Sequence, residues 1–355
     1  MKNNNKLFFR QGLIRWNSEM NQRVMPWKGE KDPYKIWLSE IILQQTRVEQ
    51  GWAYYLRFVK KFPHVQKLAA AADDTVFKLW EGLGYYSRCR NLLATARSIA
   101  NDLNGIFPST YDEIVKLKGV GPYTASAIAS FAFDIPVAVV DGNVTRVLAR
   151  YFGILTPVDS TAGKKQFALL AQELLDKTGP GLYNQAIMDF GAVVCKPQLP
   201  LCTACVLREN CAAYNTGKVA LLPVKEKKIV KKDRWFYYLV VEYKGYYFIR
   251  KRETKDIWQD LHEFILVEWE GKVDPGDLLN QEALKSILPL GFHLKEISPE
   301  YKQQLTHQTV HGRFIELVKK GGKTPDGYEK IERKRLKQLA FPRMISHFLE
   351  AKGWN

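Results

Sequence analysis

The spacing of apolar residues divides the chain into two parts. From about residue 7 to residue 213, apolar positions recur at intervals of three and four, as in Ile36, Trp37 and Ile41. This is the period of an amphipathic helix, and proline and glycine turn signals separate the successive helical stretches. We therefore predict a first domain, residues 1–215, that is all-α.

Beyond residue 234 the apolar period changes to two, which is typical of strands. Strands are expected at 235–243 and 246–252, joined as a hairpin at Lys244-Gly245, and at 262–268. A last helix is expected at 332–352, interrupted at Pro342. These elements predict an α+β second domain, and the lysine-rich stretch before it predicts a basic linker; the expected bounds are 234–355 and 216–233.

Composition adds an expected partner. Lys and Arg number 53 against 37 Asp and Glu, a formal net charge of +16. Such an excess favours a polyanion, with nucleic acid as the first candidate, although a solvated basic surface explains it equally well. No apolar run is long enough to cross a membrane, and the first residues do not resemble a signal peptide. We therefore expect a soluble, cytoplasmic protein associated with the nucleoid.

Four of the five cysteines fall within seventeen residues, with the spacing C-x6-C-x2-C-x5-C. Four thiolates in so short a loop indicate a metal centre. The spacing alone does not separate a four-iron cluster from structural zinc, and inert buried thiols are a third reading. The expected ligands are Cys195, Cys202, Cys205 and Cys211.

A glycine-rich turn is expected to bind a DNA backbone. Residues 117–125 form L-x-G-V-G-x-x-T-A between two apolar helices, which is a helix-hairpin-helix signature. Paired glycines allow backbone N–H groups to approach a phosphate closely. The contacts are expected from Gly119, Val120, Gly121 and Tyr123, and an ordinary helix C-cap is the alternative.

Two carboxylates are expected to have opposite pKa shifts. Glu40 lies among Ile36, Trp37 and Leu43 at helical spacing, and desolvation there favours its protonated form. Asp141 follows an apolar run and would cap a helix, where backbone N–H groups favour ionisation. A raised and a lowered carboxyl suit glycosidic cleavage through a cationic transition state. The alternatives are a helix-surface glutamate and a plain N-cap.

At this point the chain resembles the MutY family of adenine DNA glycosylases, within the helix-hairpin-helix superfamily that includes endonuclease III. Residues 7–213 match throughout. The segments that carry the resemblance are Leu38-Ser39-Glu40, Leu43-Gln44-Gln45-Thr46, Gly82-Leu83-Gly84-Tyr85-Tyr86, the hairpin 117–125, Val140-Asp141-Gly142-Asn143-Val144, Asn184-Gln185-Ala186, Met188-Asp189 and the cysteine spacing.

The resemblance implies a function and a set of roles. It implies a monomeric enzyme of base excision repair that flips adenine out of a mispair with 8-oxoguanine or guanine and hydrolyses its N-glycosidic bond, and it implies one [4Fe-4S] cluster. Glu40 would protonate adenine at N7 and Asp141 would stabilise the sugar cation or trap it covalently, with Tyr123 and Asn143 in support. The implied substrate contacts are base contacts from Arg23, Trp27 and Gln185 in the adenine pocket, wedge residues Gln45 and Tyr85 in the base stack, Thr46 and Leu83 at the 8-oxoguanine partner, and Leu43.

Tyr123 stands where endonuclease III has a lysine that forms a Schiff base. A phenol cannot form that imine, so we expect the reaction to stop at the abasic site, without significant strand cleavage.

The second domain resembles the Nudix-like domain of MutY, with residues 255–264 in place of the family's G-x-W-G-x-L-W-E-F stretch. Residues 265–300 contain no hydrolytic Nudix box, so we expect recognition rather than pyrophosphate hydrolysis. Family members contact 8-oxoguanine through a Phe-Ser-His turn. We align that turn with Thr309, Val310 and His311, and expect contact from Thr309, His311 or His307.

Two other functions compete with this one. A thymine or uracil mismatch glycosylase of the same superfamily would share the scaffold. A non-catalytic iron–sulfur DNA-binding protein would share the hairpin and the cysteines, yet it would not need Glu40 and Asp141 together.

Overall fold

The computed structural model describes residues 3–226, 230–279, 292–321 and 324–354. Their contacts divide the chain into two compact units. Unit 1 comprises Met1–Ala70 and Arg90–Lys228, and unit 2 comprises Ala71–Cys89 and Ile229–Asn355. The bounds predicted for the two domains and the linker, 1–215, 234–355 and 216–233, stay a prediction. Lys227 and Lys228 of the predicted linker lie outside the described residues.

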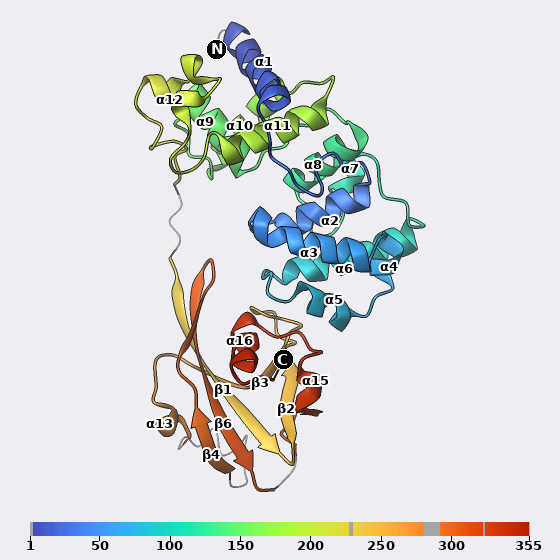
Figure 1. The fold of residues 1–355 in the computed structure, drawn as a ribbon, viewed down its shortest axis with the longest axis vertical. Coiled ribbons are helices and arrows are strands. Elements are labelled where there is room, and N and C mark those ends of the chain that lie inside the picture. The colour runs from blue at the N-terminus through green and yellow to red at the C-terminus, as the bar shows by residue number, and fades with distance from the viewer. Residues whose placement is uncertain (1–2, 227–229, 280–291, 322–323, 355) are drawn as a thin grey trace. The chain divides into compact units, whose positions relative to one another are not determined.

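Unit 1 is built of helices, as the apolar period predicted (Figure 1). Its elements are α1 (Asn3–Glu19), α2 (Pro33–Leu43), α3 (Val48–Lys61), α4 (Val65–Ala69), most of α6 (Ser87–Asp102), α7 (Tyr111–Ile114), α8 (Pro122–Phe133), α9 (Gly142–Phe152), α10 (Thr161–Leu174), α11 (Pro180–Val193), the 3-10 turns Cys202–Ala204 and Arg208–Asn210, and α12 (Ala212–Asn215).

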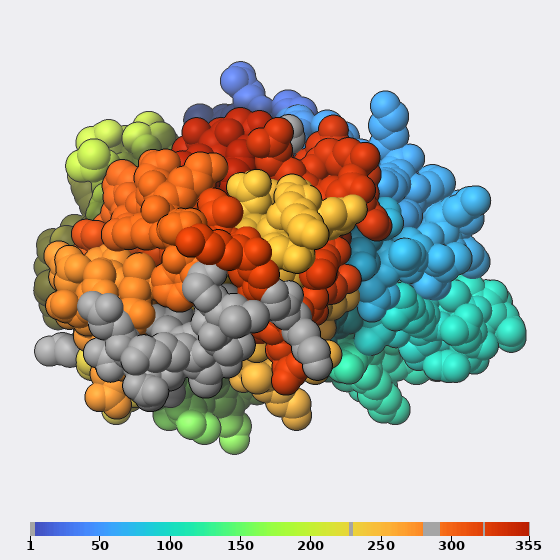
Figure 2. Space-filling view, turned by 90° about the horizontal axis from the view of Figure 1, so that it is seen from below, coloured from blue at the N-terminus to red at the C-terminus, as the bar shows by residue number. Residues whose placement is uncertain are grey.

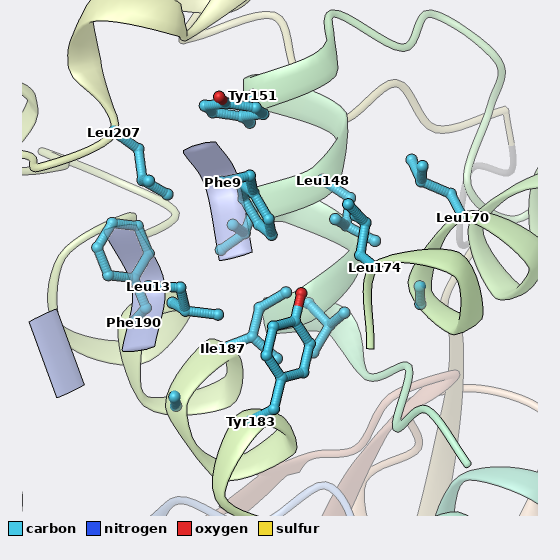
Figure 3. Close-up of a cluster of buried hydrophobic side chains, with 14 of the residues drawn as sticks. Phe9, Leu13, Leu148, Tyr151, Leu170, Leu174, Tyr183, Ile187, Phe190 and Leu207 are labelled. Carbon is cyan, nitrogen blue, oxygen red and sulfur yellow. The ribbon is translucent and has the colours of Figure 1, made fainter. Parts of the chain in front are cut away.

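One apolar core of unit 1 holds the helices that position the site. Phe9 of α1 packs against Tyr151 of α9, with ring centroids 4.7 Å apart, and Trp16 meets Phe190 of α11 edge to face. Figure 3 shows these helices with α10 converging on the core, and Leu207 reaching it from the cysteine loop. The N-terminus of α9 and one face of α11 are thereby fixed relative to each other.

Unit 2 contains a mixed sheet. Among the described residues seven strands form it, in the order β4-β6-β1-β3-β2-β7, with β5 paired to β6. The strands are β1 (Lys232–Tyr243), β2 (Tyr246–Lys251), β3 (His262–Trp269), β4 (Phe292–Ile297), β5 (Tyr301–Gln304), β6 (Gln308–Lys319) and β7 (Glu329–Glu332). Its helices are α5 (Asp73–Trp80), α13 (Pro275–Leu279), α15 (Arg333–Leu336) and α16 (Arg343–Ala351).

The predicted hairpin at Lys244-Gly245 is confirmed: both residues have positive φ, 51° and 81°, and join β1 to β2. The predicted helix 332–352, interrupted at Pro342, is confirmed as two helices, α15 and α16, although the break between them is wider than expected and covers residues 337–342. Residues up to Glu332 pair as β7 with β2, a single helical turn follows, and α16 begins only after Pro342. Pro342 cannot continue α15, and the residue before a proline is disfavoured in helical backbone, so the break begins ahead of Pro342.

Helix α16 covers one face of the sheet. Phe314 of β6 stacks on Phe348 with centroids 4.1 Å apart. The approach is close at Gly312, where an added Cβ would lie 2.1 Å from the sulfur of Met344. Residues of this C-terminal stretch, orange to red, are prominent on the face shown in Figure 2.

The segment 71–89 packs within unit 2 although it precedes unit 2's strands by 140 residues or more of sequence. Glu81 Oε1 accepts hydrogen bonds from Phe341 N and Ser346 Oγ, both at 2.9 Å, and Lys78 Nζ donates to Leu339 O at 2.9 Å. No helix in the described part of the chain is both long and apolar enough to cross a membrane.

Candidate active site

Glu40 lies on α2, a helix that is buried along most of its length. The helix begins at Pro33 after the N-cap Asp32, whose side chain accepts from Tyr34 N at 2.9 Å. Glu40 is only 5% exposed. Burial raises the pKa of its carboxyl to about 7; a hydrogen bond from Tyr123 acts against the rise, and the charge of Asp141 adds to it. The direction agrees with the desolvation that its apolar neighbours predicted.

Asp141 caps the N-terminus of α9. Its Oδ1 accepts from Val144 N at 2.7 Å and its Oδ2 from Asn143 Nδ2 at 2.7 Å. The predicted fall in its pKa is wrong: burial raises the pKa, and this effect exceeds the lowering by Val144, Asn143 and Arg146. The sequence showed the capping position but not how deeply the apolar surroundings enclose it.

Tyr123 and Asn143 each donate a hydrogen bond to one of the two carboxyl groups. The Tyr123 hydroxyl, on the first turn of α8, donates to Glu40, and burial together with both carboxylates raises the pKa of its phenol well above 10.0. Asn143 Oδ1 in turn accepts from Arg146 Nη2 at 2.8 Å. Arg146 was not predicted. Its signal was available, since it follows Asn143 by one helical turn.

Members of this group of residues line two cavities. The first, of about 360 Å³, is lined by Glu40, Trp27 and Gln185 among others. The second, of about 1050 Å³, is lined by Tyr123 and Asp141 together with basic side chains, namely Arg146, Arg150, Lys164 and Lys225. Glu40, which lines the first cavity, accepts a hydrogen bond from Tyr123, which lines the second. A cavity that holds a buried acid and an aromatic side chain, beside one lined by basic side chains, suits a base and the sugar-phosphate attached to it.

Of the three predicted base contacts, two line the first cavity. Trp27 is 8% exposed and packs edge to face on Tyr55, with centroids 5.3 Å apart. Gln185 projects from α11. Arg23 is instead held by Asp189, its Nη1 lying 2.8 Å from Oδ1. From the sequence, Asp189 was named only within the segment Met188-Asp189 that matches the family, and its ion pair with Arg23 was not predicted.

The helix-hairpin-helix turn is present between a short helix and a longer one. Helix α7 is a single turn of four residues, whereas α8 has twelve. Gly119 has a φ of 79° and lies against Asn91, whose Cβ would be 2.6 Å from an added Cβ. Only glycine combines that backbone with so close an approach. Gly119 and Gly121 are exposed, whereas Val120 is buried and anchors the turn.

Two predicted wedge residues have unusual backbones. Gln45 follows α2 in unit 1 with a φ of 56°, and Tyr85 lies in unit 2 with a φ of 47°. Both side chains are exposed. Left-handed backbone in non-glycine residues is strained and concentrates at functional sites. Of the other expected contacts, Leu43 and Thr46 are half-buried and Leu83 is buried.

The turn predicted at Thr309, Val310 and His311 is part of a strand in the structure. Thr309 and His311 belong to strand β6, 6% and 9% exposed, because β6 pairs with β1 and β5 along this stretch. His311 stacks on Trp235, and its ring nitrogens bond Glu300 at 2.8 Å and Asp233 at 3.1 Å. Assigning these residues to a turn was therefore wrong.

The β5–β6 turn is formed by Leu305, Thr306 and His307, closed by a hydrogen bond from Leu305 N to Gln308 O at 2.8 Å. His307 is exposed and Thr306 partly so. The Thr306 hydroxyl bonds that of Tyr85, within unit 2. The order of an apolar residue, a hydroxyl residue and a histidine can be read from the sequence. The strand register that leaves these three residues in the turn cannot.

The four clustered cysteines gather at one edge of the unit 1 core. Cys195, Cys205 and Cys211 pack against that core, and Arg150 Nη1 donates to Cys195 Sγ at 3.5 Å. They lie near one another: burial, and then the charges of the other three cysteines, raise the pKa of Cys205 to about 12. Four thiols are the donor set of an iron–sulfur cluster or a structural zinc centre. Among the residues that the structure describes, no set of three or more His, Cys, Asp or Glu is arranged to hold a metal ion.

Both units of the chain contain segments that match known domain families. Residues 38–175 match the HhH-GPD superfamily of base excision DNA repair proteins, and residues 236–351 match the NUDIX domain. The chain is 35% identical to the adenine DNA glycosylase of Buchnera aphidicola (strain Bp), over 88% of this chain and 86% of the relative. It is 43% identical to the adenine DNA glycosylase of Mus musculus, over 61% and 44%. Among solved structures, a thermostable thymine-DNA glycosylase matches with a TM-score of 0.56 and 29% identity, over 60% of this chain and 98% of that one.

Proposed function

The chain belongs to the adenine DNA glycosylase family, and we propose that it excises adenine paired with 8-oxoguanine or guanine after extruding the nucleotide from duplex DNA. The observation that carries the proposal is the buried Glu40, whose pKa of about 7 lets it hold a proton at neutral pH, beside a second carboxyl, Asp141. An acid next to an anion is the arrangement that glycosidic cleavage needs.

In the proposed reaction, adenine occupies the cavity lined by Glu40, Trp27 and Gln185. Glu40 transfers its proton to N7, the bond between C1′ and N9 breaks, and its electron pair leaves with the base. Asp141, held at both oxygens by Val144 and Asn143, faces the cation that develops on the sugar. Water then adds its hydroxyl to C1′ and returns a proton to Glu40.

We propose that the enzyme has no significant lyase activity. Tyr123 donates its hydroxyl to Glu40 and has no amine to attack C1′. Lys118 lies nearby in sequence on the exposed side of the hairpin. The product should therefore be an intact strand with an abasic site.

We also propose that Cys195, Cys202, Cys205 and Cys211 hold one [4Fe-4S] cluster, as the resemblance to the family implies. The support from the fold is the gathering of the four thiols and the position of their loop. Arg146 Nε donates to Cys195 O at 2.8 Å, so the loop is tied to the helix that Asp141 caps. When bound, the cluster would close this loop, and purified protein should be yellow-brown and contain iron. Cys202→Ser should lose iron and solubility together.

For 8-oxoguanine we assign recognition to the β5–β6 turn. Leu305, Thr306 and His307 reproduce the order of apolar residue, hydroxyl and histidine in the family's Phe-Ser-His turn, which Thr309 and His311 do not. The exposed His307 and the hydroxyl of Thr306 can each bond a base edge.

The test uses duplexes with adenine, thymine or uracil opposite 8-oxoguanine or guanine. Release of adenine alone, with strand breaks only after alkali, supports the proposal. Release of thymine or uracil in preference to adenine would favour the thymine-DNA glycosylase reading, which the 29% identical structure keeps in competition. Breaks that form without alkali would refute the absence of lyase activity.

A further inference from the structure

Asp189 is a fully buried carboxylate bonded to two residues that line the first cavity, Gln185 and Lys28. It projects from α11 with 0% exposure. Oδ1 accepts from Arg23 Nη1 at 2.8 Å and Gln185 Nε2 at 3.0 Å, and Oδ2 from Lys28 Nζ at 2.9 Å and Asn21 Nδ2 at 3.0 Å. The segment that precedes α2 is thereby fastened to α11.

The bond to Gln185 has a chemical consequence. A carboxylate only accepts hydrogen bonds, so the atom of the Gln185 amide that faces Asp189 must be its NH₂ group. The carbonyl oxygen Oε1 is then the amide atom available to a molecule in the cavity, since Gln185 lines that cavity. The cavity wall consequently offers a hydrogen-bond acceptor at this position.

We propose that Asp189 is a positioning residue that sets base specificity by fixing the orientation of the Gln185 amide. The inference rests on the proposed adenine excision and deepens it. An acceptor at Oε1 pairs with the 6-amino group of adenine, whereas hypoxanthine has an oxygen at the same position. Two acceptors facing each other in a desolvated site are unfavourable.

The test compares single-turnover release of adenine and of hypoxanthine, each opposite 8-oxoguanine. Wild-type protein should favour adenine. In Asp189→Asn the new amide can donate as well as accept, so Gln185 can turn its NH₂ toward the cavity. The adenine-to-hypoxanthine rate ratio should fall about tenfold, the worth of roughly one hydrogen bond.

Gln185→Met provides a second variant that leaves Asp189 with three donors. It should lower the same ratio, and adding Asp189→Asn to it should change the ratio no further, because Asp189 would act only through Gln185. Glu263→Gln serves as the matched control. Glu263 is another fully buried carboxylate, held by Arg250 and Arg252 in unit 2, and its loss should lower thermal stability without changing the ratio.

An unchanged ratio in Gln185→Met, or in a folded Asp189→Asn, would overturn the inference even if adenine is released. A further fall on adding Asp189→Asn to Gln185→Met would also overturn it, since Asp189 would then act independently of the amide. If wild-type protein releases neither base, the proposed function itself fails.

Discussion

The two parts of the molecule that we assign to catalysis and to lesion recognition hold their side chains in different ways. In unit 1, Glu40 is 5% exposed and bonded to Tyr123, and Asp141 is held at both oxygens. In unit 2, Thr306 and His307 lie in a short turn. His307 is exposed there, and the Thr306 hydroxyl is hydrogen-bonded to the hydroxyl of Tyr85.

The difference shows how chemistry and recognition can be separated in one chain. Side chains that stabilise a transition state gain from burial. A low-dielectric surrounding shifts their pKa values, and the fixed contacts around them orient their dipoles before the substrate binds. A group that reads a base edge must instead remain accessible to DNA. Changes at Glu40 or Asp141 should therefore alter the rate opposite 8-oxoguanine and guanine alike, and changes in the turn should alter the preference between these two partner bases.

The largest effect is expected from Glu40→Gln. The variant keeps the side-chain shape but cannot donate a carboxyl proton, so single-turnover adenine release should fall about 10²–10⁴-fold. Duplex affinity should be retained. The exposed variant Glu173→Gln, which breaks only a surface pair with Lys6, should release adenine at the wild-type rate. Release by Glu40→Gln at near that rate would exclude Glu40 as the acid.

A loss of about 10²-fold is expected for Asp141→Asn, because the negative charge opposite the sugar cation disappears. Asparagine is as good an N-cap as aspartate, so the free energy of unfolding should change by less than about 1 kcal/mol. Ser160, which caps α10 through Gly163 N at 2.9 Å, supplies the control. Ser160→Ala should cost about 1 kcal/mol of stability with no loss of rate. A large stability loss in Asp141→Asn with a normal rate would indicate a capping role alone.

A smaller effect is expected in the turn. Thr306→Val removes the hydroxyl and keeps the branched shape, so the ratio of excision rates opposite 8-oxoguanine and guanine should fall about tenfold. Thr309→Val, three residues on and buried in β6, should leave that ratio unchanged while lowering stability. The reverse result would return the contact to Thr309 and to the register first expected from the sequence.

The smallest effect concerns stability against pH. The pKa of Glu40 is raised from 4.5 to about 7, so between these values the native state binds a proton that the unfolded state releases. Stability from this group is therefore lost as pH rises through that window. Glu40→Gln does not titrate, so its unfolding free energy relative to wild type should increase by up to about 3 kcal/mol from pH 4.5 to pH 7. Parallel curves for the two proteins would contradict the raised pKa.

Much of unit 1 could be predicted from the sequence because its signals are local. Helical spacing, the paired glycines at Gly119 and Gly121, and the capping position of Asp141 each act over a few residues. The pKa of Asp141 could not be predicted, since it depends on burial by other segments. The hydrogen bonds that Asp189 accepts were not predicted for the same reason: their donors include Arg23 and Lys28, more than 160 residues earlier in the chain.

In unit 2 the hairpin at Lys244-Gly245 followed from turn chemistry, whereas the β5–β6 turn was misplaced. Its position depends on the pairing of β6 with β1, a parallel match between segments some 75 residues apart, such as Trp235 with His311. A different register would have moved Thr309 and His311 out of the sheet. Nothing in the local sequence around Thr306 specifies that pairing.

The most direct test of the separation is single-turnover adenine release from duplexes containing 8-oxoguanine and guanine, measured side by side for wild type, Glu40→Gln, Thr306→Val and the double variant. We expect Glu40→Gln to slow both substrates by the same factor and leave their ratio at the wild-type value. Thr306→Val should lower the ratio by the same factor in either background. A ratio that collapses in Glu40→Gln, or one that survives in Thr306→Val, would contradict the assignment of chemistry to the buried pair and preference to the turn.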